Sequence, residues 1–208
     1  HPARIAGEPV KAGIIGLGVG SLAVHAKKND TFRFYEINPE VENLAREHFT
    51  FLEDCRGKET VIIGDARTSL ENELRNGENQ AFDLLFVDAF SGDSIPIHLV
   101  TEESFQLYFD HIKDDGALVV HITNLHIDLS DPVRRLAEKF GYEAMLITDD
   151  PDWDSHLMFS EWVVVTKNPE IIKNLEDGNH INEWYREEPK PIDWTDDYSN
   201  LLQVLMWD

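Results

Sequence analysis

The chain has 208 residues, 42% of them hydrophobic, and its 40 acidic and 18 basic side chains give a formal net charge of -22. This charge repels nucleic acid and anionic membranes and favours cationic partners. The apolar runs are far shorter than the roughly 20 residues of a bilayer-spanning helix, and a single cysteine, Cys55, excludes an internal disulfide. We therefore predict a cytoplasmic protein that binds no nucleic acid and does not itself contact membrane.

Short apolar runs alternate with segments of helical periodicity, a pattern typical of an α/β fold with a parallel sheet. Strands are expected near 11–16, 31–36, 60–63, 83–88, 116–122, 143–148 and 161–166. Helices are expected near 20–27, 39–48, 67–75, 101–112 and 130–140. Asn38 and Thr101 are expected N-caps, and Gly141 a left-handed C-cap. The pattern predicts a Rossmann-like sheet of about seven mostly parallel strands, with helices on both faces.

The end of the chain differs in composition from the rest. Residues 169–208 are polar and rich in tryptophan, and we assign them to a C-terminal helical tail packed on a main domain of residues 1–168. A helix capped by Thr195 or Asp196 would pack its leucines against that domain. In the alternative, the segment WTDDY, which begins at Trp194, folds across the ligand cleft and contacts an amine.

A glycine-rich loop follows the first strand. The sequence GIIGLGVGSLAVHA places Gly16, Gly18 and Gly20 between a strand and a helix, where positive φ values and a close approach of ligand are needed. Glu36 ends the second strand, where a carboxylate can bind both hydroxyls of a ribose. Together they predict a nucleoside site. Ser21 replaces the last glycine of the dinucleotide motif, which disfavours NAD and favours an S-adenosylmethionine-type ligand.

Two more strands end in an acid, the third at Asp65 and the fourth at Asp88. Ligands of open α/β sheets bind beyond the carboxyl ends of the strands, so we expect Glu36, Asp65 and Asp88 to converge. Asp65, with Ala66 beside it, would bind the adenine side. Asp88 would anchor an ammonium group and accept its proton, or else organise its own loop. Asp93 would bind a second ammonium group, or is a surface loop acid.

The nine histidines form no metal-binding pattern. His121 and His126 follow the fifth strand at a spacing that matches no usual pair of helical ligands. We therefore predict no metal site, and we expect His121 to line the cleft or to be hydrogen-bonded in it. Asn124 is expected as its neighbour.

Five segments between residues 11 and 148 read GIIGLGVGSLA, FYEINP, GDAR, LLFVDAFSGDSIP and HLVTEESFQLYFDHIKDDGALVVHITN. Together they resemble the spermidine synthase-like proteins, and in particular the branch often fused to membrane transporter-like segments. The resemblance implies a class I methyltransferase-type fold, a decarboxylated S-adenosylmethionine donor, methylthioadenosine as product and an aminopropyl transfer to a diamine such as putrescine. It also implies that Glu36 binds ribose, that Asp65 lies on the adenine side and that Asp88 is the catalytic aspartate.

The sequence departs from true spermidine synthases at two places. Their G-G-G-D-G loop carries an acid where this chain has Val19, and their D-S-S-D-P loop matches Asp93 only with two extra residues. Val19 favours a second hypothesis, a methyltransferase that uses intact S-adenosylmethionine. Ile14 speaks against it, because many such enzymes have an acid at that position. A third hypothesis is a non-catalytic nucleoside- or polyamine-binding domain.

The predicted partner is a small cationic amine, and a homodimer is left open. If the chain belongs to the membrane-fused branch, it is the cytosolic part of a longer membrane-attached protein.

Overall fold

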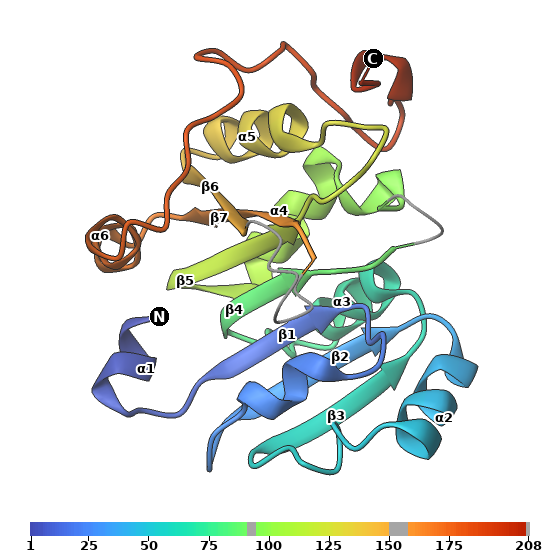
Figure 1. Cartoon of the computed structure of the whole chain (residues 1–208). Helices are drawn as coiled ribbons and strands as arrows, with labels where there is room; N and C mark the ends of the chain where they lie inside the picture. Colours follow the sequence, from blue (N-terminus) through green and yellow to red (C-terminus); the bar gives the residue numbers. More distant parts are fainter. Residues whose placement is uncertain (91–94, 150–157, 207–208) are drawn as a thin grey trace.

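One seven-stranded sheet organises the protein, with strand order β3-β2-β1-β4-β5-β7-β6 (Figure 1). The structure, a computed structural model, describes residues 1–90, 95–149 and 158–206. The strands are β1 Lys11–Ile15, β2 Thr31–Glu36, β3 Lys58–Ile63, β4 Phe82–Val87, β5 Ile112–His121, β6 Glu143–Asp149 and β7 Ser160–Thr166. The first five strands are parallel to one another, whereas β7 runs antiparallel to both β5 and β6. All seven predicted strands are confirmed, and the order reverses between β1 and β4, where open sheets bind ligands.

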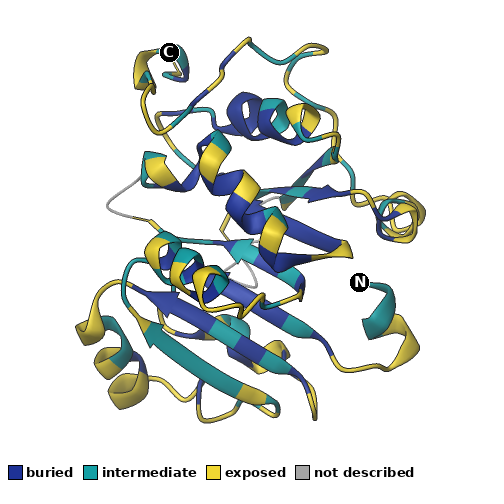
Figure 2. Ribbon diagram, turned by 180° about the vertical axis from the view of Figure 1, so that it is seen from behind, coloured by how far each residue is buried: buried dark blue, intermediate teal, exposed yellow. Residues whose placement is uncertain are grey.

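Helices cover both faces of this sheet, as predicted. They are α1 Pro2–Ala6, α2 Pro39–His48, α3 Ala66–Arg75, α4 Glu102–His111, α5 Ser130–Lys139 and α6 Pro169–Asp177, with 3-10 helices η1 Ser21–His25, η2 Ile97–Leu99 and η3 Leu201–Gln203. The α3, α4 and α5 helices pack on one face, and η1 and α2 pack on the other. Buried residues lie along the sheet and on the helix sides that face it (Figure 2).

The capping residues predicted at Asn38, Thr101 and Gly141 are confirmed. The Asn38 side chain accepts a hydrogen bond from the N–H of Glu40, and Gly141 has φ +70°. Thr101 and Ser104 form a reciprocal capping box at the start of α4. These caps fix the direction in which α2 and α4 leave the carboxyl edge of the sheet.

The predicted helix at 20–27 is wrong in type and length. Only Ser21–His25 is helical, and it is a 3-10 helix whose N-cap, Gly20, makes no side-chain capping bond. Tighter 3-10 bonding is usual in runs this short. The glycine loop is therefore followed by one short turn, and not by the N-terminus of a longer helix.

The C-terminal extension is less helical than predicted. Beyond α6, its described part contains the 3-10 turn η3, and the helix expected from Thr195 or Asp196 is not formed. Asp196 is unavailable as a cap because its carboxylate binds the Arg67 guanidinium, which holds the pKa of Asp196 below its usual value. Trp194 is nonetheless buried within the main core. The domain division at residue 168 stays a prediction.

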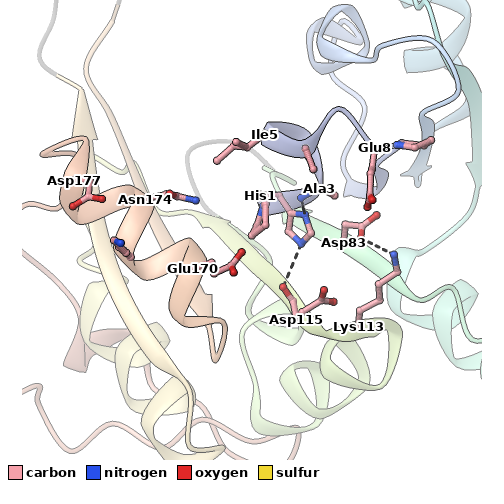
Figure 3. Close-up of a pocket in the computed structure, with 14 residues that line it drawn as sticks. His1, Ala3, Ile5, Glu8, Asp83, Lys113, Asp115, Glu170, Asn174 and Asp177 are labelled. Carbon is pink, nitrogen blue, oxygen red and sulfur yellow. Dashed lines mark hydrogen bonds and ion pairs between the residues drawn. The ribbon is translucent and has the colours of Figure 1, made fainter.

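A cavity of about 640 Å³ lies at the amino edge of the sheet, between α1, α6 and the starts of β4 and β5 (Figure 3). Its buried acid, Asp83, already has partners. Lys113 Nζ lies 2.6 Å from Asp83 Oδ1, and the N–H of Lys11 donates to Asp83 Oδ2 over 2.7 Å. The charge of this acid is therefore matched within the protein.

In the described part of the chain, no helix is both long enough and apolar enough to cross a membrane.

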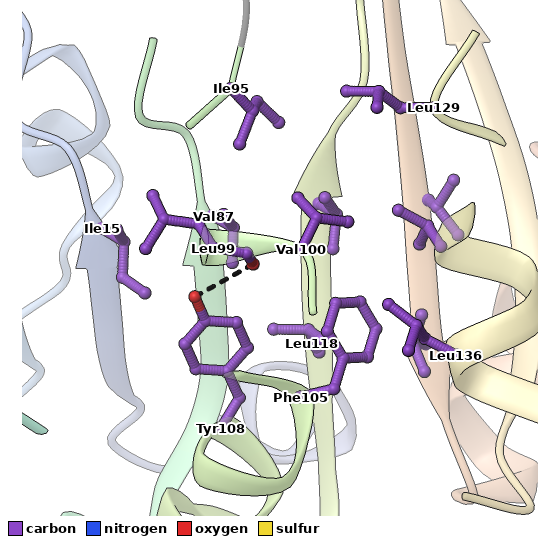
Figure 4. Close-up of a cluster of buried hydrophobic side chains, with 14 of the residues drawn as sticks. Ile15, Val87, Ile95, Leu99, Val100, Phe105, Tyr108, Leu118, Leu129 and Leu136 are labelled. Carbon is purple, nitrogen blue, oxygen red and sulfur yellow. Dashed lines mark hydrogen bonds between the residues drawn. The ribbon is translucent and has the colours of Figure 1, made fainter. Parts of the chain in front are cut away.

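The larger hydrophobic core continues up to the carboxyl edge of the sheet (Figure 4). Phe105 and Tyr108 of α4 are fully buried there beside Leu118 of β5, and burying a side chain of this size contributes about 1.5–3 kcal/mol. The Tyr108 hydroxyl donates to the carbonyl oxygen of Leu99 over 3.1 Å. This bond ties η2 to the core, and η2 forms a wall of the candidate site.

Candidate active site

A cavity of about 940 Å³ opens at the carboxyl edge of the sheet, at the point where the strand order reverses. Glu36, Asp65 and Asp88 all line it, so the expected convergence of the three acids is confirmed. Further predicted residues that line it are Gly16, Gly18 and Ala66. Asp93 lies outside the described residues.

Gly20 is not among the described lining residues, although it was predicted to bind cofactor. Its φ is +82°, and a Cβ at this position would lie 2.9 Å from Cγ of Leu52. The glycine therefore lets the loop pack back onto the protein, and its role is in the turn.

The glycine loop joins the ends of two strands. Gly16 has φ +98°, and a Cβ there would overlap the carbonyl oxygen of Asp88. The N–H of Asp88 donates to the carbonyl oxygen of Ile15 over 2.9 Å. By contrast, a Cβ at Gly18 would meet open space. Gly16 is thus required for the close approach of β1 and β4, whereas Gly18 leaves room on the cavity side.

Glu36 is held by backbone N–H groups. Its Oε2 accepts from the N–H of Leu17 over 3.1 Å and its Oε1 from the N–H of Asn38 over 2.9 Å, while the residue is 8% exposed. A carboxylate has about four acceptor positions. Glu36 therefore orients the glycine loop and still has lone pairs for a ligand.

Asp65 is the N-cap of α3. Its Oδ1 accepts from the N–H of Thr68 over 2.8 Å, and its Oδ2 lies 3.3 Å from Nε2 of His98 in η2. Burial acts to raise the pKa of Asp65, but the hydrogen bonds from Thr68 and His98 outweigh it and leave the pKa below its usual value. Asp65 is therefore a well-oriented anion at neutral pH.

Asp88 is held by a side chain from the next strand. Its Oδ1 lies 2.7 Å from Nδ1 of His121, and Nε2 of His121 lies 2.7 Å from Oγ1 of Thr123. The His121 ring stacks on Trp162 of β7, with ring centroids 4.2 Å apart, and makes a T-shaped contact with Phe90. The prediction that His121 is hydrogen-bonded in the cleft is confirmed.

Asn124, predicted as a neighbour of His121, organises the loop after β5. Its Oδ1 accepts from the N–H groups of His126 and Ile127, over 2.8 and 2.9 Å. Within the described residues, no three His, Cys, Asp or Glu side chains come together as a metal site.

Three further residues of the site were not predicted: His98, Trp162 and Phe90. His98 lines the cavity from η2, and Trp162 contacts His121 because β7 pairs with β5, a long-range pairing that the sequence does not signal. The alternative role of WTDDY, a fold across the cleft, is wrong. No residue of this segment is among the described lining residues, and Asp196 is bound to Arg67.

Apart from the ionisable ring of His98, the charged side chains of the described lining are all negative. The described lining has three carboxylates, apolar walls that include Ile95 and Leu99, and neither lysine nor arginine. In a cavity with apolar walls, carboxylates attract cations more strongly than they do in open water. The arrangement can hold a polar, nucleoside-sized ligand beside one or more positive charges.

The order of the strands, the glycine loop after β1 and the acid at the end of β2 define a class I methyltransferase-type fold. Solved structures agree. Spermidine synthase from Thermotoga maritima matches with TM-score 0.58 and 17% identity, over 96% of this chain and 66% of that one. Human methyltransferase-like protein 13, in complex with SAH, matches with TM-score 0.64 and 18% identity, over 89% of each chain.

The sequence is spermidine synthase-like as well. A polyamine aminopropyltransferase of Vibrio vulnificus is 31% identical over 117 residues, which is 55% of this chain and 38% of that protein. An N-terminal histidine N-methyltransferase of Emericella nidulans is 30% identical over 110 residues, 52% of this chain and 19% of that protein. The matches thus span well under half of either relative. No family model matches the sequence.

Proposed function

We propose that this chain is a spermidine synthase-like transferase, which moves an aminopropyl group from decarboxylated S-adenosylmethionine to a small amine such as putrescine. The observation that carries this proposal is the cavity at the carboxyl edge, where three acids meet and the described lining has no basic side chain except His98. Intact S-adenosylmethionine carries a carboxylate that the acids would repel, whereas the decarboxylated donor and the amine are both cationic.

The residues present fit such a donor. Glu36 would accept hydrogen bonds from the ribose hydroxyls with the lone pairs that Leu17 and Asn38 leave free. Asp65 and Ala66 would lie on the adenine side, and the open space at Gly18 leaves room for the ligand. Bound donor would supply a sulfonium group, whose carbon–sulfur bond breaks with its electron pair left on sulfur.

Asp88 would act on the amine. An ammonium ion must lose a proton before its nitrogen can attack carbon, and a positioned carboxylate can both bind the ion and accept that proton. The new bond then joins the amine nitrogen to the transferred carbon, and the proton resides on Asp88 until it passes to water.

Calorimetry with decarboxylated donor, intact donor, methylthioadenosine and putrescine tests the proposal. We expect tight binding of the decarboxylated donor and turnover with an amine. Asp88→Asn should keep nucleoside affinity and lose turnover by roughly 100-fold or more. Equal rates in the variant and the parent would exclude Asp88 as the catalytic residue. Binding of both substrates without turnover would instead favour a binding domain.

Val19 supports a second candidate, an S-adenosylmethionine-dependent methyltransferase. This residue lines the cavity where spermidine synthases carry the acid that holds the donor amine. Binding of intact donor, with none of the decarboxylated form, would favour the methyltransferase.

A further inference from the structure

The direction of each hydrogen bond around His121 follows from which of its atoms can donate and which can only accept. The N–H of Glu161 donates to Oγ1 of Thr123 over 2.7 Å. An ionised Asp88 can only accept, so Nδ1 of His121 must carry a proton. In the neutral ring Nε2 is then an acceptor, and the Thr123 hydroxyl donates to it over 2.7 Å in preference to the carbonyl oxygen of Glu161, which lies 3.5 Å from Oγ1. The chain therefore runs from the backbone of β7 through Thr123 and His121 to Asp88.

Packing holds the His121 ring in the plane that this chain requires. His121 and Trp162 are directly opposite residues of the antiparallel β5–β7 pair, and their rings are within 9° of parallel. Phe90, two residues beyond Asp88, makes a T-shaped contact with the ring, with centroids 4.8 Å apart. The ring is thus fixed by two aromatic side chains and by a hydrogen bond at each nitrogen.

We propose that His121 is a positioning residue for Asp88, held by Thr123 in the Nδ1–H tautomer so that one carboxylate oxygen is always occupied and the other faces the amine. Within the described residues, Oδ2 of Asp88 has no hydrogen-bond partner. This assignment rests on the proposed function only for the identity of the group that Oδ2 meets.

The arrangement reverses the familiar serine protease triad, where an aspartate orients a histidine. Here a histidine orients an aspartate. The proton lost by the amine goes to Oδ2 of Asp88, and His121 keeps its own proton throughout. His121 fixes the direction of the carboxylate and prevents its rotation, so its loss should lower kcat and leave nucleoside binding alone.

The tautomer can be measured without substrate. In ¹⁵N-histidine-labelled protein at neutral pH, the resonance pair that disappears in His121→Phe belongs to His121. We expect Nδ1 to carry the proton and Nε2 to be unprotonated. Thr123→Val should change this signature because it removes the hydroxyl that fixes Nε2. A proton on Nε2 in the wild-type protein would overturn the proposal, and this result does not depend on which reaction the protein catalyses.

Two substitutions separate positioning from packing. His121→Phe keeps a ring against Trp162 but donates no hydrogen bond, whereas His121→Asn places an amide N–H near the position of Nδ1 without the ring. We expect His121→Phe to lower kcat roughly 10- to 100-fold, as is typical when a functional side chain loses its orienting partner. His121→Asn should recover most of that loss, and methylthioadenosine affinity should change less than twofold in both.

If His121→Asn were as impaired as His121→Phe, a donor at the position of Nδ1 would not restore function and the positioning role would be wrong. Unchanged kcat in His121→Phe would overturn it too. Should the wild-type protein show no turnover with any donor and amine, the proposed function fails while the tautomer measurement still decides the role of His121. Thermal unfolding of each variant verifies that the fold is kept.

Discussion

The two halves of the cavity hold their acids in different ways. In the half that we propose for the nucleoside, called the nucleoside half, Glu36 and Asp65 are held mainly by backbone N–H groups of the adjoining turns. In the half that we propose for the amine, called the amine half, Asp88 is held by His121, 33 positions away on the next strand. Among point substitutions only a change to proline removes a backbone donor, and it also constrains the backbone, whereas many substitutions remove a side-chain donor. The amine half is therefore where single changes alter chemistry without altering the fold.

Gly16→Ala should have the largest effect, because Gly16 lies where the two halves meet. A Cβ there overlaps the Asp88 carbonyl and requires φ +98° from alanine. We expect a loss of roughly 3 kcal/mol or more in the free energy of unfolding, together with loss of nucleoside binding. The matched control is Gly18→Ala, which meets open space at φ +53° and should cost only about 1–2 kcal/mol. Urea unfolding measures both, and equal losses would refute the joint role of Gly16.

Glu36→Gln should come next. One end of the new amide must place its NH₂ against the N–H of Leu17 or Asn38, so one hydrogen bond is lost. We expect a loss of about 1–3 kcal/mol in stability and weaker nucleoside binding. Asp65→Asn should weaken nucleoside binding but change stability by less than about 0.5 kcal/mol, because asparagine is an equally good N-cap. Calorimetry and urea unfolding of the two variants would separate these effects.

Asp196→Asn should have a smaller effect. Asp196 ties the C-terminal extension to Arg67, which follows the cavity-lining Ala66, and it is 39% exposed. We expect a loss of about 0.5–1 kcal/mol in stability with nucleoside affinity unchanged. Asp197→Asn is the control, since Asp197 is exposed and forms no ion pair among the described residues. A drop in nucleoside affinity in Asp196→Asn would show that the extension shapes the cavity.

The pH dependence of Asp65 should be the smallest effect. Its pKa is lowered in the folded protein, so its contribution to stability is present above the pKa of about 3.9 of an unfolded aspartate and is lost as pH falls through the lower folded value. Between pH 4.5 and 2.5, wild-type protein should therefore lose more stability than Asp65→Asn. Parallel acid-unfolding curves would contradict this.

The nucleoside half could be predicted from the sequence because its signals are local. Once the strands are recognised, glycines between a strand and a helix and acids at strand ends indicate a ligand site at the carboxyl edge of the sheet. Glu36, Asp65 and Asp88 converge for that reason. The helix type after the glycines could not be predicted, because Gly20 begins the turn without a side-chain cap.

The surroundings of Asp88 could be predicted only in part. The expectation that His121 is hydrogen-bonded was sound. Its contact with Asp88, however, depends on β5 lying beside β4, and its contact with Trp162 depends on β7 lying between β5 and β6. In the C-terminal extension, Asp196 has the pattern of a helix cap, yet a contact with Arg67 outweighs it. Long-range pairing of this kind has no local signature.

Because β7 runs against the other strands, its beginning, and not its end, lies at the carboxyl edge of the parallel strands. Trp162 therefore stacks on His121 from a strand that contributes no described residue to the cavity lining. A change at Trp162 would therefore act on Asp88 through His121 and leave the cavity-lining residues themselves unaltered.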